Sequence, residues 1–217
     1  TLKSSGHTVF STIDGFFTIS GVPSGKQELI INGREANLGV FAILAVPVNL
    51  IEGVLNNLPS PITLPDVDLD AEVVVSAVFT TIVSNPSVPG VELAIPGGTA
   101  KNSDGTLFTG KLSINPVPDY GRPESRPEEL RPGMAITIQP AGVRFNPPAR
   151  LTFPNADGMP PGSELNLWSL SPDTGTFNLV GKGVVTQDGQ SIITTEGGVS
   201  ASAWHFFLAS SPTPASA

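Results

Sequence analysis

The amino-acid sequence predicts an all-β protein made of two tandem β-sandwich units. The 217 residues include 23 glycines and 22 prolines, and only 14% are charged, which favours many turns and few long helices. Short apolar segments rich in β-branched residues recur along the chain, as in a protein of many short strands. Asp-Gly and Pro-Ser-Gly sequences, which form tight turns, separate these segments.

The first unit is expected to span residues 1–80. Its clearest part is 11–33, where turns at Asp14-Gly15 and Ser24-Gly25 separate apolar segments. The segment 38–55 has the apolar content of a helix, but its β-branched residues, Pro47 and Gly53 favour strand. Strands are expected at 8–10, 16–19, 27–31, 41–50, 54–58 and 62–69.

The second unit is expected to span residues 81–209, entered through an apolar bridge at 71–82 that packs the two units closely. Many short strands at regular spacing indicate a sandwich or partial barrel. The stretch 116–132 reads as one extended loop, and 210–217 has linker composition, which predicts a further domain beyond it. Strands are expected at 91–95, 107–115, 134–139, 149–153, 164–171, 177–185, 191–195 and 203–209.

Charge and cysteine usage narrow the range of partners. The net charge is −8 and the few basic residues are scattered, whereas nucleic acids and anionic membranes need a concentrated basic surface. The sequence contains no cysteine, so neither a disulfide framework nor a thiolate metal site can form. No apolar run approaches the roughly 18 residues of a membrane span. We therefore expect no nucleic-acid partner and no membrane insertion.

The first unit resembles the carboxypeptidase regulatory-like family. The resemblance rests on Ile13-Asp-Gly-Phe-Phe-Thr-Ile19, Gly21-Val-Pro-Ser-Gly25 and Leu29-Ile-Ile-Asn-Gly33. It implies a sandwich of prealbumin-like or Ig-like character. The family's usual first strand has no counterpart after Thr1, so this copy is expected to lack that strand or to begin it earlier.

The second unit resembles a β-sandwich of very large bacterial surface and secreted proteins, some of which carry Rhs/YD repeats, and its opening is similar to ZU5 domains. The matching residues are 89–99, 112–118, 136–140, 149–155, Trp168 and Pro172-Asp173. The resemblance implies a bacterial, extracellular or cell-surface protein. Neighbouring domains of the same polypeptide are then the expected partners.

No catalytic residue is predicted. His205-Phe206-Phe207 resembles the His-Phe-Ser step at which some ZU5-type domains cleave themselves, but Phe207 offers no nucleophile. A Gly-x-Ser-x-Gly elbow is absent, and His7 is the only other histidine. We therefore expect a non-catalytic structural or scaffold module. The alternatives are a carbohydrate- or protein-binding adhesion module and the plug or cap of an Rhs-type toxin.

Two groups of residues are weak candidates for binding. Asp66, Asp68, Asp70 and Glu72 alternate along the chain, so on a strand they would share one face and could offer oxygen ligands to calcium. The competing interpretation is the solvent face of a strand, and no other cofactor is expected. Tyr120 and Trp168 are the candidates for a protein or glycan contact, although only 6% of residues are aromatic, which argues against a lectin.

Overall fold

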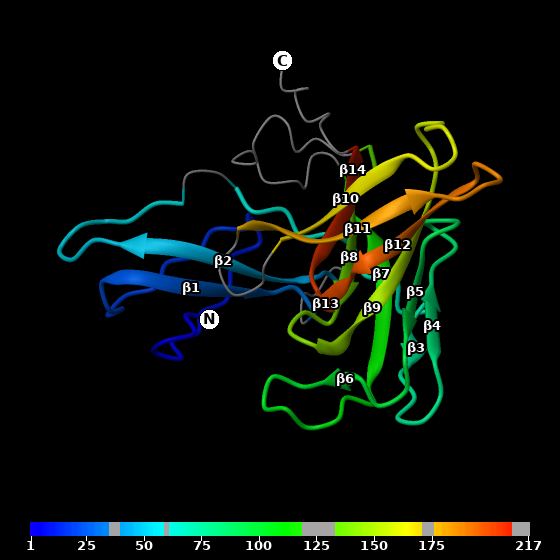
Figure 1. The fold of residues 1–217 in the computed structure, drawn as a ribbon. Coiled ribbons are helices and arrows are strands. Elements are labelled where there is room, and N and C mark those ends of the chain that lie inside the picture. Colours follow the sequence, from blue (N-terminus) through cyan, green and yellow to red (C-terminus); the bar gives the residue numbers. More distant parts are fainter. Residues whose placement is uncertain (35–39, 59–60, 119–132, 171–175, 210–217) are drawn as a thin grey trace, which may run out of the picture.

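The computed structural model describes residues 1–34, 40–58, 61–118, 133–170 and 176–209. These residues form strands and no helix, which confirms the all-β class. No helix long and apolar enough to cross a membrane is found among them. Two sheets are present, a two-stranded arm and a twelve-stranded sheet that curls almost into a barrel (Figure 1).

The arm consists of β1 (Gly25–Asn32) and β2 (Ile43–Leu50), an antiparallel pair that extends away from the barrel in Figure 1. Thr1 and Ile30 exchange backbone hydrogen bonds of 2.9 and 2.8 Å, and Lys3 N donates to Glu28 O at 3.0 Å. The first residues therefore run antiparallel along the outer edge of β1.

The barrel sheet has the strand order β3-β7-β8-β14-β10-β11-β12-β9-β5-β4, with β6 and β13 also paired to β9. Asn85 follows β4 and its Nδ2 donates to Ile114 O on β7 at 2.8 Å, which ties the two ends of the sheet together. The strands are β3 (Val73–Val74), β4 (Thr81–Ser84), β5 (Glu92–Ile95), β6 (Ala100–Lys101), β7 (Lys111–Pro116), β8 (Ile136–Gln139), β9 (Arg144–Pro154), β10 (Glu164–Leu170), β11 (Phe177–Val185), β12 (Ser191–Gly197), β13 (Val199–Ala201) and β14 (Trp204–Ala209).

The main hydrophobic core fills the barrel. Side chains along each strand alternate between the two faces of the sheet, and on β10 and β4 every second residue is buried. Burial of these aliphatic and aromatic side chains is the main stabilising term of the fold. Fully buried members of this core include Val83, Leu93, Ile95, Leu112, Ile114, Ile136, Ile138, Leu151 and Leu167.

A second apolar cluster lies on the outer face of β14 and β10. Trp204 and Phe206 are buried there with Val117 and Ala135, and the half-buried Leu44 of β2 packs against them. The rings of Phe177 and Phe206 meet edge to face at 5.6 Å between centroids. The base of the arm therefore covers an apolar patch that would otherwise face water.

The sequence predicts the barrel strands well and the arm less well. The expected strands at 27–31, at 41–50 and after residue 90 are confirmed, each overlapping an observed strand. The predicted strands at 8–10, 16–19, 54–58 and 62–69 are wrong, because these segments join no ladder beyond an isolated bridge between Phe41 and Asp66. The division into two tandem sandwiches is not confirmed, and the boundary at residue 80 stays a prediction.

Candidate functional site

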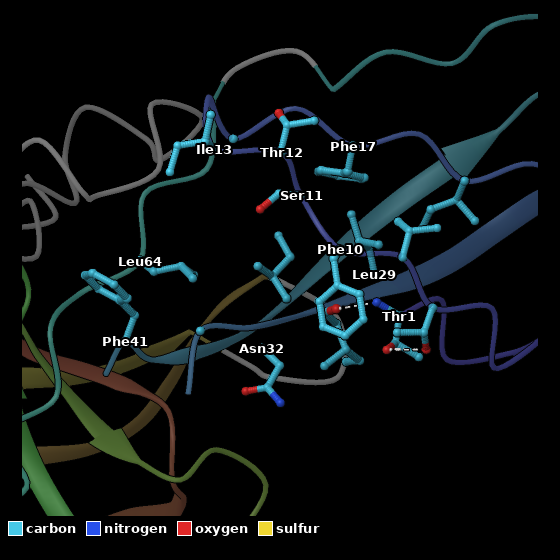
Figure 2. Close-up of a pocket in the computed structure, with 17 residues that line it drawn as sticks. Thr1, Phe10, Ser11, Thr12, Ile13, Phe17, Leu29, Asn32, Phe41 and Leu64 are labelled. Atoms are coloured by element: carbon cyan, nitrogen blue, oxygen red, sulfur yellow. Dashed lines mark hydrogen bonds between the residues drawn. The ribbon is translucent and has the colours of Figure 1, made fainter. Parts of the chain in front are cut away.

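A cavity of about 790 Å³ lies between the N-terminal segment and β1. This volume falls within the roughly 300–1,000 Å³ of typical ligand pockets. Figure 2 shows the segment around Ser11, Thr12 and Ile13 running above β1, with Phe41 and Leu64 at one end of the opening and Thr1 at the other. The lining residues come from 1–19, from 29–33 of β1 and its continuation, and from Phe41 and Leu64.

Among the residues that the structure describes, no ionisable side chain lines the cavity. Its walls are mainly apolar, and its polar side chains are hydroxyls and one amide, those of Thr1, Thr8, Ser11, Thr12 and Asn32. Two of the hydroxyls already bond to each other, Thr1 Oγ1 to Thr8 Oγ1 at 2.8 Å. Besides its apolar walls, the described lining offers neutral hydroxyl and amide groups for hydrogen bonding, together with the α-amino group of Thr1, which donates to Ile30 O.

The outer wall of the cavity exposes large apolar side chains. Thr12 N donates to Phe16 O at 2.8 Å and Gly15 N to Thr12 O at 3.0 Å, which closes a tight turn. Gly15 has φ +82° there, a conformation that favours glycine. Phe10, Ile13 and Phe16 are 83%, 86% and 76% exposed. Three large exposed apolar side chains therefore lie within seven residues of one another, around this turn.

Two buried amide side chains fix the arm to the barrel. Gln139 Oε1 on β8 accepts from Ile43 N at 3.0 Å, while Gln139 Nε2 donates to Thr137 Oγ1 at 2.9 Å. Asn115 Oδ1 on β7 accepts from Asp68 N at 2.7 Å. Both amides are almost fully buried. We refer to Asn115 and Gln139 as the amide clamp; the clamp holds β2 and the chain around Asp68 against the outer face of the barrel.

Sequence reasoning missed the amide clamp. The sequence signal for it is a polar residue at every second position, Ser113 and Asn115 on β7 and Thr137 and Gln139 on β8. Across the two strands, Ser113 pairs with Gln139 and Asn115 pairs with Thr137. Such alternation usually indicates a solvent face. Here β2 and the chain around Asp68 cover that face, so Gln139 and Asn115 hydrogen-bond to the covering backbone instead of to water.

We expect Gln139→Ala to lower the free energy of unfolding by about 1–3 kcal/mol, because the partly buried Ile43 N would lose its hydrogen-bond partner. Equilibrium urea unfolding followed by Trp fluorescence measures the change. The control is Gln190→Ala, since Gln190 is exposed and a surface substitution changes stability by roughly 0.5 kcal/mol or less. Equal effects of the two substitutions would contradict the role of the clamp.

The acidic residues proposed for calcium do not converge. Asp68 Oδ1 accepts from Asp70 N at 3.0 Å and Ala71 N at 3.3 Å, so this carboxylate caps a turn. Glu72 pairs with Arg34 at 3.0 Å and with Lys111 at 3.7 Å. Asp66 is exposed on the isolated bridge with Phe41. No group of three potential metal ligands occurs in the described part of the chain.

We expect the thermal unfolding midpoint to be the same with calcium and with a chelator. The reason is that Glu72, the last of the four acids, already has its charge balanced by Arg34 and Lys111. Differential scanning calorimetry of the chelator-treated protein, with calcium added back at millimolar concentration, makes the comparison. A midpoint that rises on calcium addition would restore the calcium hypothesis for these residues.

His205 lies sealed inside the barrel. It is fully buried on β14, on the same side of the strand as the core residue Phe207. Its Nδ1 lies 3.2 Å from Ala203 O, and its Nε2 has no hydrogen-bond partner. Burial in this apolar surrounding lowers the pKa of His205 to about 4. The imidazole is therefore neutral at pH 7, and its cross-strand neighbours are the uncharged Ser169 and Ile136.

The aromatic candidates are not brought together as a site. Trp168 is half-buried on β10 and packs against the outer cluster around Trp204 and Phe206. Tyr120 lies outside the described residues. The described aromatic side chains that are most exposed are instead Phe10, Phe16 and Phe79.

Comparison with known proteins adds no relative: no family model matches the chain, and no curated protein or solved structure is significantly similar to it. The resemblances to carboxypeptidase regulatory-like and ZU5 domains stay predictions. The functional argument accordingly rests on the geometry of the barrel, the arm and the cavity.

Proposed function

We propose that this chain is a non-catalytic structural module that presents the two-stranded arm from a rigid barrel. The observation that carries the proposal is the chemistry of its cavity: none of the seventeen described residues that line it has an ionisable side chain. The rigid presentation is supported by the amide clamp and by the apolar contact of Leu44 with the barrel.

The burial of His205 supports the same proposal. A general base must reach the proton that it abstracts, either directly or through one water. The imidazole of His205 is fully enclosed, and neither ring nitrogen contacts a serine hydroxyl or a carboxylate. The remaining histidine, His7, is exposed near the start of the arm.

The host is proposed to be a large bacterial secreted or cell-surface protein, with neighbouring domains of the same polypeptide as partners. This part of the proposal rests on the sequence resemblance alone. A protein-binding adhesion module is the second candidate, favoured by the exposed Phe10, Ile13 and Phe16 beside the cavity.

A panel of chromogenic esters, phosphate esters and glycosides, incubated with the purified chain between pH 5 and 8, tests the absence of catalysis. We expect no release of chromophore above the buffer rate. The variants His205→Leu and His7→Leu form a matched pair of buried and exposed histidines. Turnover that persists in His7→Leu and disappears in His205→Leu would contradict the proposal.

A further inference from the structure

We propose that the cavity of the arm binds an extended, uncharged β-strand from a partner protein, which pairs with the exposed backbone of residues 9–11 and 17–19. This inference goes beyond the scaffold role. It makes the arm a strand-addition site, a mode in which main-chain hydrogen bonds supply affinity and alternate side chains fill pockets.

The first observation that supports strand binding is unpaired backbone on the cavity wall. Val9, Phe10 and Ser11 form no backbone hydrogen bond within the described residues, and neither do residues 17–19. Both segments have the β-branched and aromatic composition of strands. Extended segments with free N–H and C=O groups are templates for pairing with another strand.

The second observation that supports strand binding is the outer edge of β1. Ile30 turns its N–H and C=O toward Thr1, on the side away from β2. The pairing of Thr1 to Lys3 demonstrates that this edge accepts an antiparallel strand.

The lining defines the side chains that such a strand must carry. Leu29, Ile31, Phe41 and Leu64 contribute apolar surface, and none of the lining side chains in the described part of the chain is charged. A charged side chain placed there would lose its hydration without gaining a partner, which is strongly unfavourable. The bound strand is therefore expected to present apolar residues at alternate positions and to carry no charge between them.

The same backbone favours a polypeptide over a hydrocarbon ligand. A lipid chain lying in the cavity would displace water from the N–H and C=O groups of residues 9–11 and leave them without partners. A strand replaces that water with hydrogen bonds. The exposure of Phe10 and Ile13, at 83% and 86%, leaves apolar surface that a bound strand would cover.

The test uses a capped heptapeptide of alternating threonine and valine, titrated calorimetrically into the whole chain. A second peptide of the same sequence carries N-methyl groups at alternate amides, so it keeps the side chains and loses the donors. We expect the first peptide to bind, and the second to bind at least about tenfold more weakly, as expected for the loss of two or more hydrogen bonds. Hydrogen exchange should slow at residues 9–11 and 17–19 when the first peptide is bound.

Substitutions locate the site. Phe10→Asp adds a charge to the cavity wall and should weaken binding of the first peptide at least about tenfold. Phe79→Asp is the matched control, because Phe79 is 75% exposed and does not line the cavity. Circular dichroism of both variants confirms the fold.

Three outcomes would overturn the proposal. The first peptide could fail to bind at millimolar concentration. The N-methylated peptide could bind equally well, which would make the cavity a site for small apolar molecules. Light scattering could instead reveal a dimer that Phe10→Asp disrupts and the peptide does not, which would make a second copy of the chain the occupant.

Discussion

Phe207→Ala is expected to lower the free energy of unfolding by about 3–5 kcal/mol, the usual cost of truncating a buried aromatic side chain. Phe207 lies in the barrel core on β14 and is 6% exposed. Its ring meets that of Phe153 edge to face, with 5.5 Å between centroids and 78° between planes. The substitution would therefore remove both buried apolar area and an aromatic pair that links β14 to β9.

The neighbourhood of Phe207 leaves little room for the core to collapse around the smaller side chain. A Cβ on Gly183 of β11 would lie 2.6 Å from the Phe207 ring, so the ring already rests on bare backbone. Equilibrium unfolding in guanidinium chloride measures the loss. The control is Phe79→Ala, whose exposed ring should change stability by roughly 0.5 kcal/mol or less. A loss below about 1 kcal/mol for Phe207→Ala would contradict the barrel core as described.

Acidification from pH 6.5 to pH 4 is expected to reduce the contribution of His205 to stability by about 3 kcal/mol. Above pH 6.5 the imidazole is neutral in both the folded and the unfolded chain, so its titration adds nothing. Below pH 6.5 the unfolded chain takes up the proton, while burial holds the folded pKa at about 4. The unfolded state binds more protons in this window, so stability falls as the pH falls.

The variant His205→Leu isolates this effect from the titration of carboxylates. Leucine cannot bind a proton, so the difference in unfolding free energy between the variant and the parent should change by about 3 kcal/mol between pH 7 and pH 4. Parallel profiles for the parent and His205→Leu would mean that His205 is open to solvent.

The barrel is predictable from the sequence because its strands obey a local rule. At the start of β10, the polar Glu164 and Asn166 alternate with the buried Leu165 and Leu167, as the faces of a half-buried strand require. The Asp-Gly turns at Gly105 and Gly189 adopt the positive φ that the dipeptide predicts. These signals lie within a few residues of one another, so no knowledge of distant partners is needed.

The arm depends on distant partners, and the sequence therefore describes it poorly. Residues 16–19 have strand composition, but a strand needs a neighbouring strand to bond with, and none of the described strands pairs with them. The polar positions of Asn115 and Gln139 suggest a wet surface until β2 is seen lying over them. The acids at 66–72 alternate in the sequence and would share one face of a strand. In the structure the chain turns at Asp68, and Glu72 forms an ion pair with Arg34.

The candidate site also combines features that are encoded locally in the sequence with features that depend on distant segments. No single motif encodes the cavity, because its walls come from the first nineteen residues, from β1 and from Phe41 and Leu64. The local sequence predicts a non-catalytic module, from the absence of cysteine, the two histidines and Phe207 after Phe206, and this stays a prediction.

Native-state hydrogen exchange tests most directly the central claim that the barrel holds the arm as one rigid unit. The amides of Ile43 and Asp68, which bond to the clamp residues Gln139 and Asn115, should exchange with the same free energy as the core amides of Leu93 and Ile138, through global unfolding. Exchange of Ile43, Asp68 and the β1 amides together, at a free energy several kcal/mol below that of the barrel, would contradict the claim and make the arm an independent unit.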